Sequence, residues 1–137
     1  MKPIIGLLAL ASLSAVTSPA LAQGQPTGTW VTQTGETRVR IAPCGGQLCG
    51  TVVWLKQPAK DSQNPDASKR DRDLVGTTML TMSPSGSNQW SGTLYRYTDG
   101  QTFKGNLTMA GPNTLQLQGC GGPFNAVCRS QTWSRVN

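Results

Sequence analysis

The sequence predicts an all-β fold, a small eight-stranded antiparallel up-and-down barrel held by disulfides. Three observations lead to this expectation. Short runs of alternating polar and apolar side chains are separated by Gly, Pro, Asn and Asp. No segment keeps the period of an amphipathic helix. The four cysteines, an even number, fit a disulfide framework in an oxidising compartment, which would reinforce the thin core of a short chain.

The first residues have the pattern of a secretory signal peptide. Lys2 precedes an uncharged apolar stretch over residues 4–16, and Ala20-Leu21-Ala22 is a small-x-small cleavage signature. We expect residues 1–22 to be removed and residues 23–137 to form a single barrel domain, exported to the periplasm or the extracellular space. No other apolar run is long enough to cross a bilayer, so stable membrane insertion is not expected.

The expected strands follow one another between turn signals. They cover residues 29–32, 37–41, 48–55, 74–82, 89–97, 102–110, 114–119 and 131–136. The pair Asp99-Gly100 between the fifth and sixth strands is a strong hairpin signal. Strands with one apolar face require a closed interior, and eight short strands fit a barrel that leaves no free edge. A sandwich is the alternative from the pattern alone.

One connection, residues 56–73, differs from the rest. It carries five basic and four acidic residues, and residues 66–72 could form a brief helix after the turn signal Asn64-Pro65-Asp66. A connection of this length is either functional or simply mobile. The whole chain has 12 basic and 6 acidic residues, and only Lys2 of these lies in the expected signal peptide. The simplest interpretation of this excess of basic residues is a surface charge that keeps the protein in solution.

The four cysteines allow three pairings. Chain entropy favours long-range bridges, but in an up-and-down barrel the third strand is not a neighbour of the last connection. We therefore expect the local pairs Cys44–Cys49 and Cys120–Cys128, each across one turn. A zinc site is the alternative, although four and seven intervening residues fit its usual ligand spacing poorly. Neither pair has the C-x-x-C spacing of a redox centre.

The segment Ile41–Leu55, which contains Cys44-Gly-Gly-Gln-Leu-Cys49-Gly50, resembles the signature of a bacterial family called domain of unknown function 2147. The likeness continues through Asp61, Asn64-Pro65-Asp66, Arg70-Asp71-Arg72, Leu74-Val75-Gly76, Trp90-Ser91-Gly92, Tyr95, Gly119-Cys120 and Gln131–Val136. The resemblance implies a small exported protein with a lipocalin-like (calycin) barrel.

The motif Gly28-Thr29-Trp30 is similar to the Gly-x-Trp that opens the first strand of lipocalins. In those proteins the tryptophan plugs the closed end of the barrel, and an arginine of the last strand packs over its ring as a cation–π contact. The resemblance implies that Trp30 and Arg135 form such a barrel-closing pair.

Enzymatic activity is not expected from the residue types available. Acid–base or nucleophilic catalysis needs a tuned proton-transfer group or a nucleophile beside a base, and the chain has no histidine. Four of the six carboxylates lie in residues 56–73, where neighbouring cations should keep them ionised. No cofactor or metal is expected, since Asp61, Asn64 and Asp66 lack the calcium-loop spacing. Few, scattered aromatic residues and export argue against nucleic-acid binding.

A binding function needs only a concave apolar site, which an eight-stranded barrel can supply if side chains do not fill it. The residues expected to face the interior, and so a small apolar ligand, are Val39, Ile41, Trp54, Trp90, Leu94, Phe103, Leu107 and Leu115. Plain core packing is the competing interpretation of the same residues. An alternative function is an envelope- or protein-binding module that uses the basic 56–73 connection, with an unknown partner.

Overall fold

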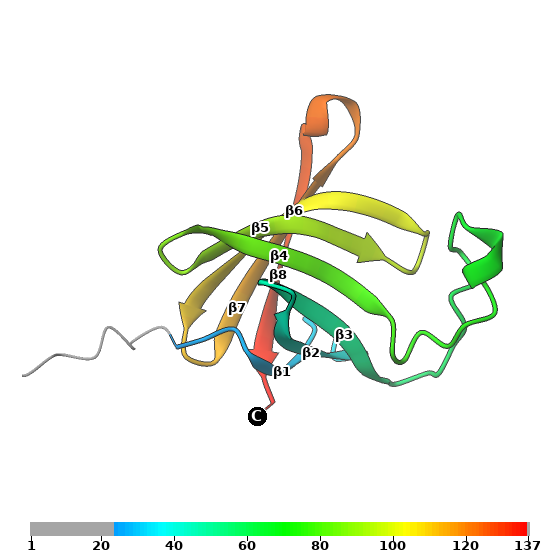
Figure 1. Cartoon of the computed structure of the whole chain (residues 1–137), viewed down its shortest axis with the longest axis horizontal. Helices are drawn as coiled ribbons and strands as arrows, with labels where there is room; N and C mark the ends of the chain where they lie inside the picture. Colours follow the sequence, from blue (N-terminus) through cyan, green and yellow to red (C-terminus); the bar gives the residue numbers. More distant parts are fainter. Residues whose placement is uncertain (1–23, 137) are drawn as a thin grey trace, which may run out of the picture.

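Figure 1 shows the computed structural model of the chain, which describes residues 24–136. Eight antiparallel strands follow one another around a closed barrel, and pairing of β8 with β1 completes it. The strands are β1 (Gly28–Val31), β2 (Thr37–Cys44), β3 (Gln47–Leu55), β4 (Thr78–Gly86), β5 (Gln89–Arg96), β6 (Gln101–Gly111), β7 (Thr114–Gly121) and β8 (Val127–Arg135). The expected all-β up-and-down barrel is confirmed. The expected signal peptide, residues 1–22, lies outside the described residues.

The barrel has two unlike ends, which we call the open and the closed end. The β1–β2, β3–β4, β5–β6 and β7–β8 connections lie at the open end, and the other three turns lie at the closed end. In Figure 1 the long β3–β4 connection (green) and the β7–β8 hairpin (orange) project beyond the sheet. Because the closed-end turns are short, most of the chain that could build a binding site lies at the open end.

The hydrophobic core fills the closed end. It arises because alternate residues of each strand point inward, as the sequence pattern indicates. The fully packed cluster comprises Trp30, Val39, Ile41, Leu80, Met82, Leu107, Met109, Leu115, Leu117 and Trp133. None of these ten side chains is more than 5% exposed. This half of the barrel is therefore solid.

Trp30 and Arg135 seal the closed end together. The Arg135 guanidinium lies 4.4 Å from the centroid of the Trp30 ring, and the two residues are paired across β1 and β8. The Trp30 indole nitrogen donates a hydrogen bond to the Pro26 carbonyl over 2.8 Å. Arg135 also donates to the carbonyls of Pro112 and Thr27, each over 2.9 Å. The chain leading into β1 is thereby held across the end of the barrel.

Both disulfides are local, as expected. Cys44–Cys49 closes the β2–β3 turn with its Cα atoms 5.8 Å apart, and Cys120–Cys128 joins directly opposed residues of β7 and β8 at 4.1 Å. The first bridge lies at the closed end, whereas the second lies at the base of the projecting β7–β8 hairpin (Figure 1). Two disulfides are consistent with an oxidising compartment.

The interior position expected for Trp54 is wrong. The register between β2 and β3 shifts, because Arg38 pairs with Trp54 while Val39 pairs with Val52. The extra residue, Val53, makes a bulge, which breaks the alternation and leaves two successive side chains outside. Val53 is 41% exposed and Trp54 is 39% exposed. The Arg38 guanidinium covers the Trp54 ring from the solvent side, 4.9 Å from its centroid.

Two strands also start four residues away from the expected position. β4 begins at Thr78 rather than near residue 74, because the Leu74 and Gly76 amides bond to Ala59 and Val52 outside the β4 ladder. β8 begins at Val127, four residues before the expected start. In the 56–73 connection, the expected brief helix is a single 3₁₀ turn, Ala67–Lys69, that Asp66 caps through the Ser68 amide.

A buried carboxylate, Asp61, ties the β3–β4 connection to the barrel. Its side chain is wholly buried and accepts hydrogen bonds from the Tyr95 hydroxyl at 2.5 Å and the Asn64 amide at 2.8 Å. The Arg72 guanidinium donates to it as well and forms a 2.9 Å salt bridge. We call Asp61, Asn64, Arg72 and Tyr95 the Asp61 clasp. Since Tyr95 belongs to β5, the clasp fixes the connection against the open end.

The clasp explains the ionisation of its members. Burial alone would raise the pKa of the Asp61 carboxyl, but hydrogen bonds from Tyr95, Asn64 and Arg72 outweigh burial and hold that pKa below its ordinary range. Burial and the bond to Asp61 raise the pKa of the Tyr95 phenol to about 12. Asp61 is therefore an anion and Tyr95 a neutral donor at neutral pH.

The turn between β5 and β6 is shaped to receive the same connection. Gly100 has φ of 73°, and a Cβ atom placed there would lie 1.9 Å from the Gln63 carbonyl oxygen. Only glycine allows this close backbone approach.

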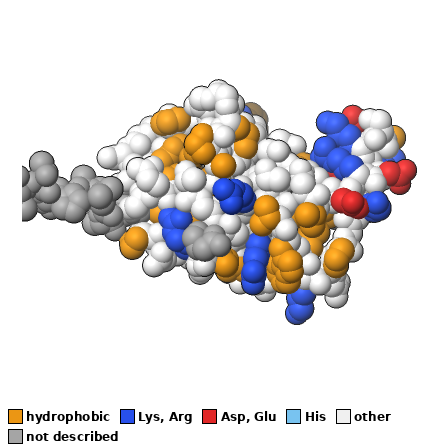
Figure 2. All heavy atoms as spheres, turned by 60° about the horizontal axis from the view of Figure 1, so that its bottom comes forward, with side chains coloured by type: hydrophobic (Ala, Val, Ile, Leu, Met, Phe, Trp, Pro, Cys, Tyr) orange, Lys and Arg blue, Asp and Glu red, His pale blue; other side chains and the backbone are white. Residues whose placement is uncertain are grey.

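Figure 2 shows basic and acidic side chains intermingled on the projecting connection rather than separated by sign.

Candidate functional site

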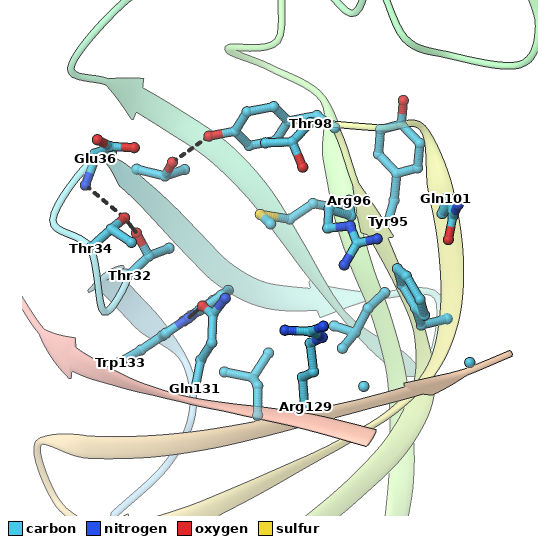
Figure 3. Close-up of a pocket in the computed structure, with 18 of the residues that line it drawn as sticks. Thr32, Thr34, Glu36, Tyr95, Arg96, Thr98, Gln101, Arg129, Gln131 and Trp133 are labelled. Carbon is cyan, nitrogen blue, oxygen red and sulfur yellow. Dashed lines mark hydrogen bonds between the residues drawn. The ribbon is translucent and has the colours of Figure 1, made fainter. Parts of the chain in front are cut away.

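The open end holds a cavity of about 510 Å³, shown in Figure 3. Its apolar lining is formed by one side chain from each of five successive strands, namely Met79, Leu94, Phe103, Leu117 and Trp133, and the last two make its floor. Leu117 and Trp133 also belong to the closed-end core, so the cavity rests directly on it. Its volume falls in the range of about 300–1,000 Å³ that is usual for small-molecule sites.

The walls and mouth of the cavity are polar. They carry hydroxyl, amide and charged groups from the β1–β2 turn, the β5–β6 turn and β8, namely Thr32, Thr34, Glu36, Thr37, Tyr95, Arg96, Tyr97, Thr98, Gln101, Arg129 and Gln131. Some of these groups are already paired with one another. The Thr37 and Tyr97 hydroxyls are 2.8 Å apart, and the Trp133 indole nitrogen donates to the Gln131 side-chain oxygen over 3.0 Å.

Glycines make room for the cavity by letting large side chains fold against the wall. A Cβ atom on Gly121 would lie 2.6 Å from the Phe103 ring, and one on Gly105 would lie 2.6 Å from Leu94. Both glycines are inward positions of their strands, next to Gly119, which also borders the cavity. The Phe103 and Leu94 side chains therefore occupy the space that residues larger than glycine would take. The centre of the open half is left unfilled.

The eight residues expected to face a ligand divide into four groups. Leu94 and Phe103 line the cavity. Val39, Ile41, Leu107 and Leu115 are completely buried in the closed-end core and do not reach it. Trp90 is partly buried and packs against the same core. Trp54 is outside the barrel, as described above. The competing interpretation, plain core packing, therefore holds for half of the set.

Two arginines border the cavity; Arg96 is paired with a carboxylate, and Arg129 is not paired within residues 24–136. The Arg96 guanidinium lies 4.6 Å from the Phe103 ring centroid, and its Nε donates to the Asp99 carboxylate over 2.9 Å. The hydrogen bond with Asp99 raises the pKa of Arg96 and lowers that of Asp99, so both stay charged and their charges compensate. Arg129 has no hydrogen bond or salt bridge to another side chain of residues 24–136.

Sequence reasoning missed Arg129, Gln131 and the Asp61 clasp. The first two could have been found, because they precede Trp133 by four and two residues and share its inward face on a strand. The expected last strand began too late to include Arg129. The burial of Asp61 left no signal in the sequence, since a carboxylate in a charged connection ordinarily faces solvent.

Residues 24–136 contain no group of three or more His, Cys, Asp or Glu side chains placed to hold a metal ion. No helix in that range is long and apolar enough to cross a bilayer.

Comparison with known proteins connects this fold to a family. The chain is similar in structure to a protein of the human pathogen Helicobacter pylori that is described as belonging to the lipocalin family, with a TM-score of 0.74 and 18% sequence identity. The match covers 82% of this chain and 84% of the other. At that identity it shows a shared barrel fold. No curated protein matches the sequence. Residues 28–135 match the model of a family described as uncharacterised proteins conserved in bacteria, and the chain therefore belongs to the family of domain of unknown function 2147.

Proposed function

We propose that the protein is a non-enzymatic binder of a small, largely apolar molecule, which occupies the open-end cavity. The observation that carries the proposal is the contrast between the two halves of the barrel. The closed half buries ten apolar side chains almost completely, whereas the open half keeps about 510 Å³ above an apolar floor. An eight-stranded barrel is wide enough for one small ligand when its interior side chains leave space. Transfer of apolar surface from water to this floor would drive binding.

Binding agrees better than catalysis with the groups at the site. The ionisable side chains around the cavity are Glu36, two tyrosines and two arginines. Tyr95, with its pKa raised to about 12, donates to Asp61 and is a poor base or nucleophile at neutral pH. No nucleophile with an adjacent base is present among the residues that border the cavity. The lipocalin-like fold is in accord with a binding role, although fold alone does not assign one.

The proposed place of action is outside the cytoplasm. We propose that residues 1–22 act as a signal peptide and that the released residues 23–137 form a single-domain barrel in the periplasm or the extracellular space. Two disulfides support an oxidising setting. N-terminal sequencing of the protein purified from its native compartment would test the cleavage after Ala22.

A neutral apolar fluorophore, N-phenyl-1-naphthylamine, tests the cavity as a binding site. We expect its fluorescence to rise and saturate at one molecule per chain. In Gly119→Val the added side chain would enter the cavity from β7, with its Cβ 3.3 Å from Leu94. One methylene of space in an apolar pocket changes affinity about 10–200-fold, so we expect the dissociation constant to rise at least tenfold.

Gly111→Val is the matched control for that variant. Gly111 lies at the closed end of β6, and a Cβ atom there would meet nothing within 4 Å. We expect it to bind the fluorophore as the wild type does. Equal binding by both variants, or no binding by the wild type, would reject the cavity as the site.

The alternative, an envelope- or protein-binding module built on the 56–73 connection, has weaker support. Its five basic and four acidic residues leave a net charge of only +1, and two of the five cations are paired, Arg72 with Asp61 and Lys60 with Asp73, at 2.9 Å each. Mixed charges of this kind do not make a strong anion-binding face (Figure 2). Salt-sensitive retention of the wild type on anionic lipid vesicles, lost on replacing Lys69 and Arg70, would favour the alternative.

A further inference from the structure

We infer that the ligand of this cavity is an amphipathic anion, whose acidic head group binds Arg129 while its apolar part lies on the floor. The inference rests on the proposed function and adds the chemical class of the ligand. The inference is based on Arg129, a charged side chain that β8 directs into the cavity.

Arg129 occupies an inward position of β8. Side chains two residues apart on a strand share a face, so Arg129 and Gln131, both exposed at the open end, lie on the same side as the buried Trp133. Figure 3 shows Arg129 and Gln131 directed into the cavity from β8, with Arg96 reaching in from across it. Four residues of strand separate Arg129 from Trp133, a span of about 13 Å. The site therefore has a cationic upper level and an apolar lower level.

The other charges at the mouth leave Arg129 as the uncompensated cation. Arg96 is neutralised by Asp99, which binds it through both carboxylate oxygens. Glu36 is exposed on the β1–β2 turn and lies at the far edge of the cavity from Arg129 in Figure 3. Among residues 24–136, no other acidic side chain borders the cavity. An anion that enters this mouth meets a guanidinium with all its donors available within the described residues.

Gln131 adds a second donor to the same level. Its side-chain oxygen accepts the Trp133 indole hydrogen, and this bond fixes which way the amide points. Within residues 24–136 the amide nitrogen donates to no other group, so it can donate on the same inward face as the Arg129 guanidinium. Adjacent donors suit the oxygens of a carboxylate, sulfate or phosphate monoester. A neutral polar head would gain hydrogen bonds but no charge-assisted ones.

Displacement of N-phenyl-1-naphthylamine by laurate and by lauryl alcohol tests the inference, because the two competitors share one alkyl chain and differ in charge. We expect the wild type to bind laurate about tenfold more tightly than lauryl alcohol, the lower end for a charge-assisted hydrogen bond at a partly exposed site. Arg129→Gln should abolish this preference and leave lauryl alcohol unaffected. Arg40→Gln, an exposed arginine on the outer face of β2, lowers the net charge equally and should retain the preference.

The outcomes separate the inference from the proposed function. Equal affinity for both competitors in the wild type, or an equal loss of laurate binding in Arg129→Gln and Arg40→Gln, would overturn the inference and leave the cavity intact as a site. Failure of the fluorophore and of both competitors to bind would reject the proposed function itself. A thermal midpoint of Arg129→Gln close to the wild type's would show that the variant is folded, as we expect from a side chain without structural partners.

Discussion

Replacing Asp61 by asparagine isolates the contribution of the Asp61 clasp to stability. The substitution keeps the shape of the side chain and removes its charge. One asparagine oxygen can still accept from Tyr95, but its amide group would then face the donors of Asn64 and Arg72. Two donors would be left without an acceptor at a site that is wholly buried. The connection would therefore keep its bond to Tyr95 of β5 but lose the bonds from Asn64 and Arg72 that hold Asp61 in place.

The magnitude follows from the unequal burial of the two charges, since Asp61 is wholly buried and Arg72 is not. Removing one partner of a fully buried ion pair costs about 3–5 kcal/mol. The Arg72 side chain is 40% exposed, so water can solvate it in the variant and the loss should lie at the lower end, about 3 kcal/mol. For a domain of this size that loss corresponds to a fall of about 12 °C in the thermal unfolding midpoint.

Thermal and urea unfolding followed by circular dichroism would measure the loss. Asp73→Asn is the matched control, since it removes the same charge from the same connection, where Asp73 and Lys60 have 72% and 59% of their side chains exposed. Exposed pairs of this kind contribute little, and we expect its midpoint to stay near that of the wild type. If Asp61→Asn were as stable as Asp73→Asn, the clasp would not hold the connection and the reasoning would be refuted.

Two further predictions concern acid and redox conditions. Because the pKa of Asp61 lies below its ordinary value in the folded protein, the unfolded chain binds the proton more readily; the stabilisation is present above about pH 4 and is lost as the pH falls through the folded pKa. The wild type should thus lose more free energy of unfolding than Asp61→Asn between about pH 5 and pH 2, and parallel curves in urea titrations would contradict this. Replacing Cys120 and Cys128 together by serine should cost about 2–3 kcal/mol, the chain entropy of a loop of this size, and an unchanged urea midpoint under oxidising conditions would argue against a stabilising role for the bridge.

The alternation of polar and apolar residues predicted most of the fold but little of the candidate site. Alternation on β2, β6 and β7 correctly predicted which side chains face inward, because these side chains either join the closed-end core or, like Phe103, line the cavity above it. The pattern failed at Trp54, because one extra residue in β3 makes a bulge that turns the Trp54 side chain to the outside of the barrel. A bulge depends on how two strands meet, so the sequence of one strand does not reveal it.

The cavity could not be predicted because its volume depends on side chains from strands far apart in the sequence. Phe103 lies against Gly121, and Leu94 lies against Gly105, so neither fills the centre of the open half. These contacts require the register of three neighbouring strands to be known. The inward direction of Arg129, by contrast, could have been predicted, because alternate residues of a strand share a face and Arg129 lies four residues before Trp133.

A crystal structure of the protein soaked or co-crystallised with laurate tests the central claim most directly, since the claim is that the open-end cavity is the binding site. The account predicts an alkyl chain inside the cavity in contact with Phe103 and Trp133, with the carboxylate beside Arg129 and Gln131. A cavity closed by its own side chains, or laurate bound only on the outer surface near Trp54, would contradict it.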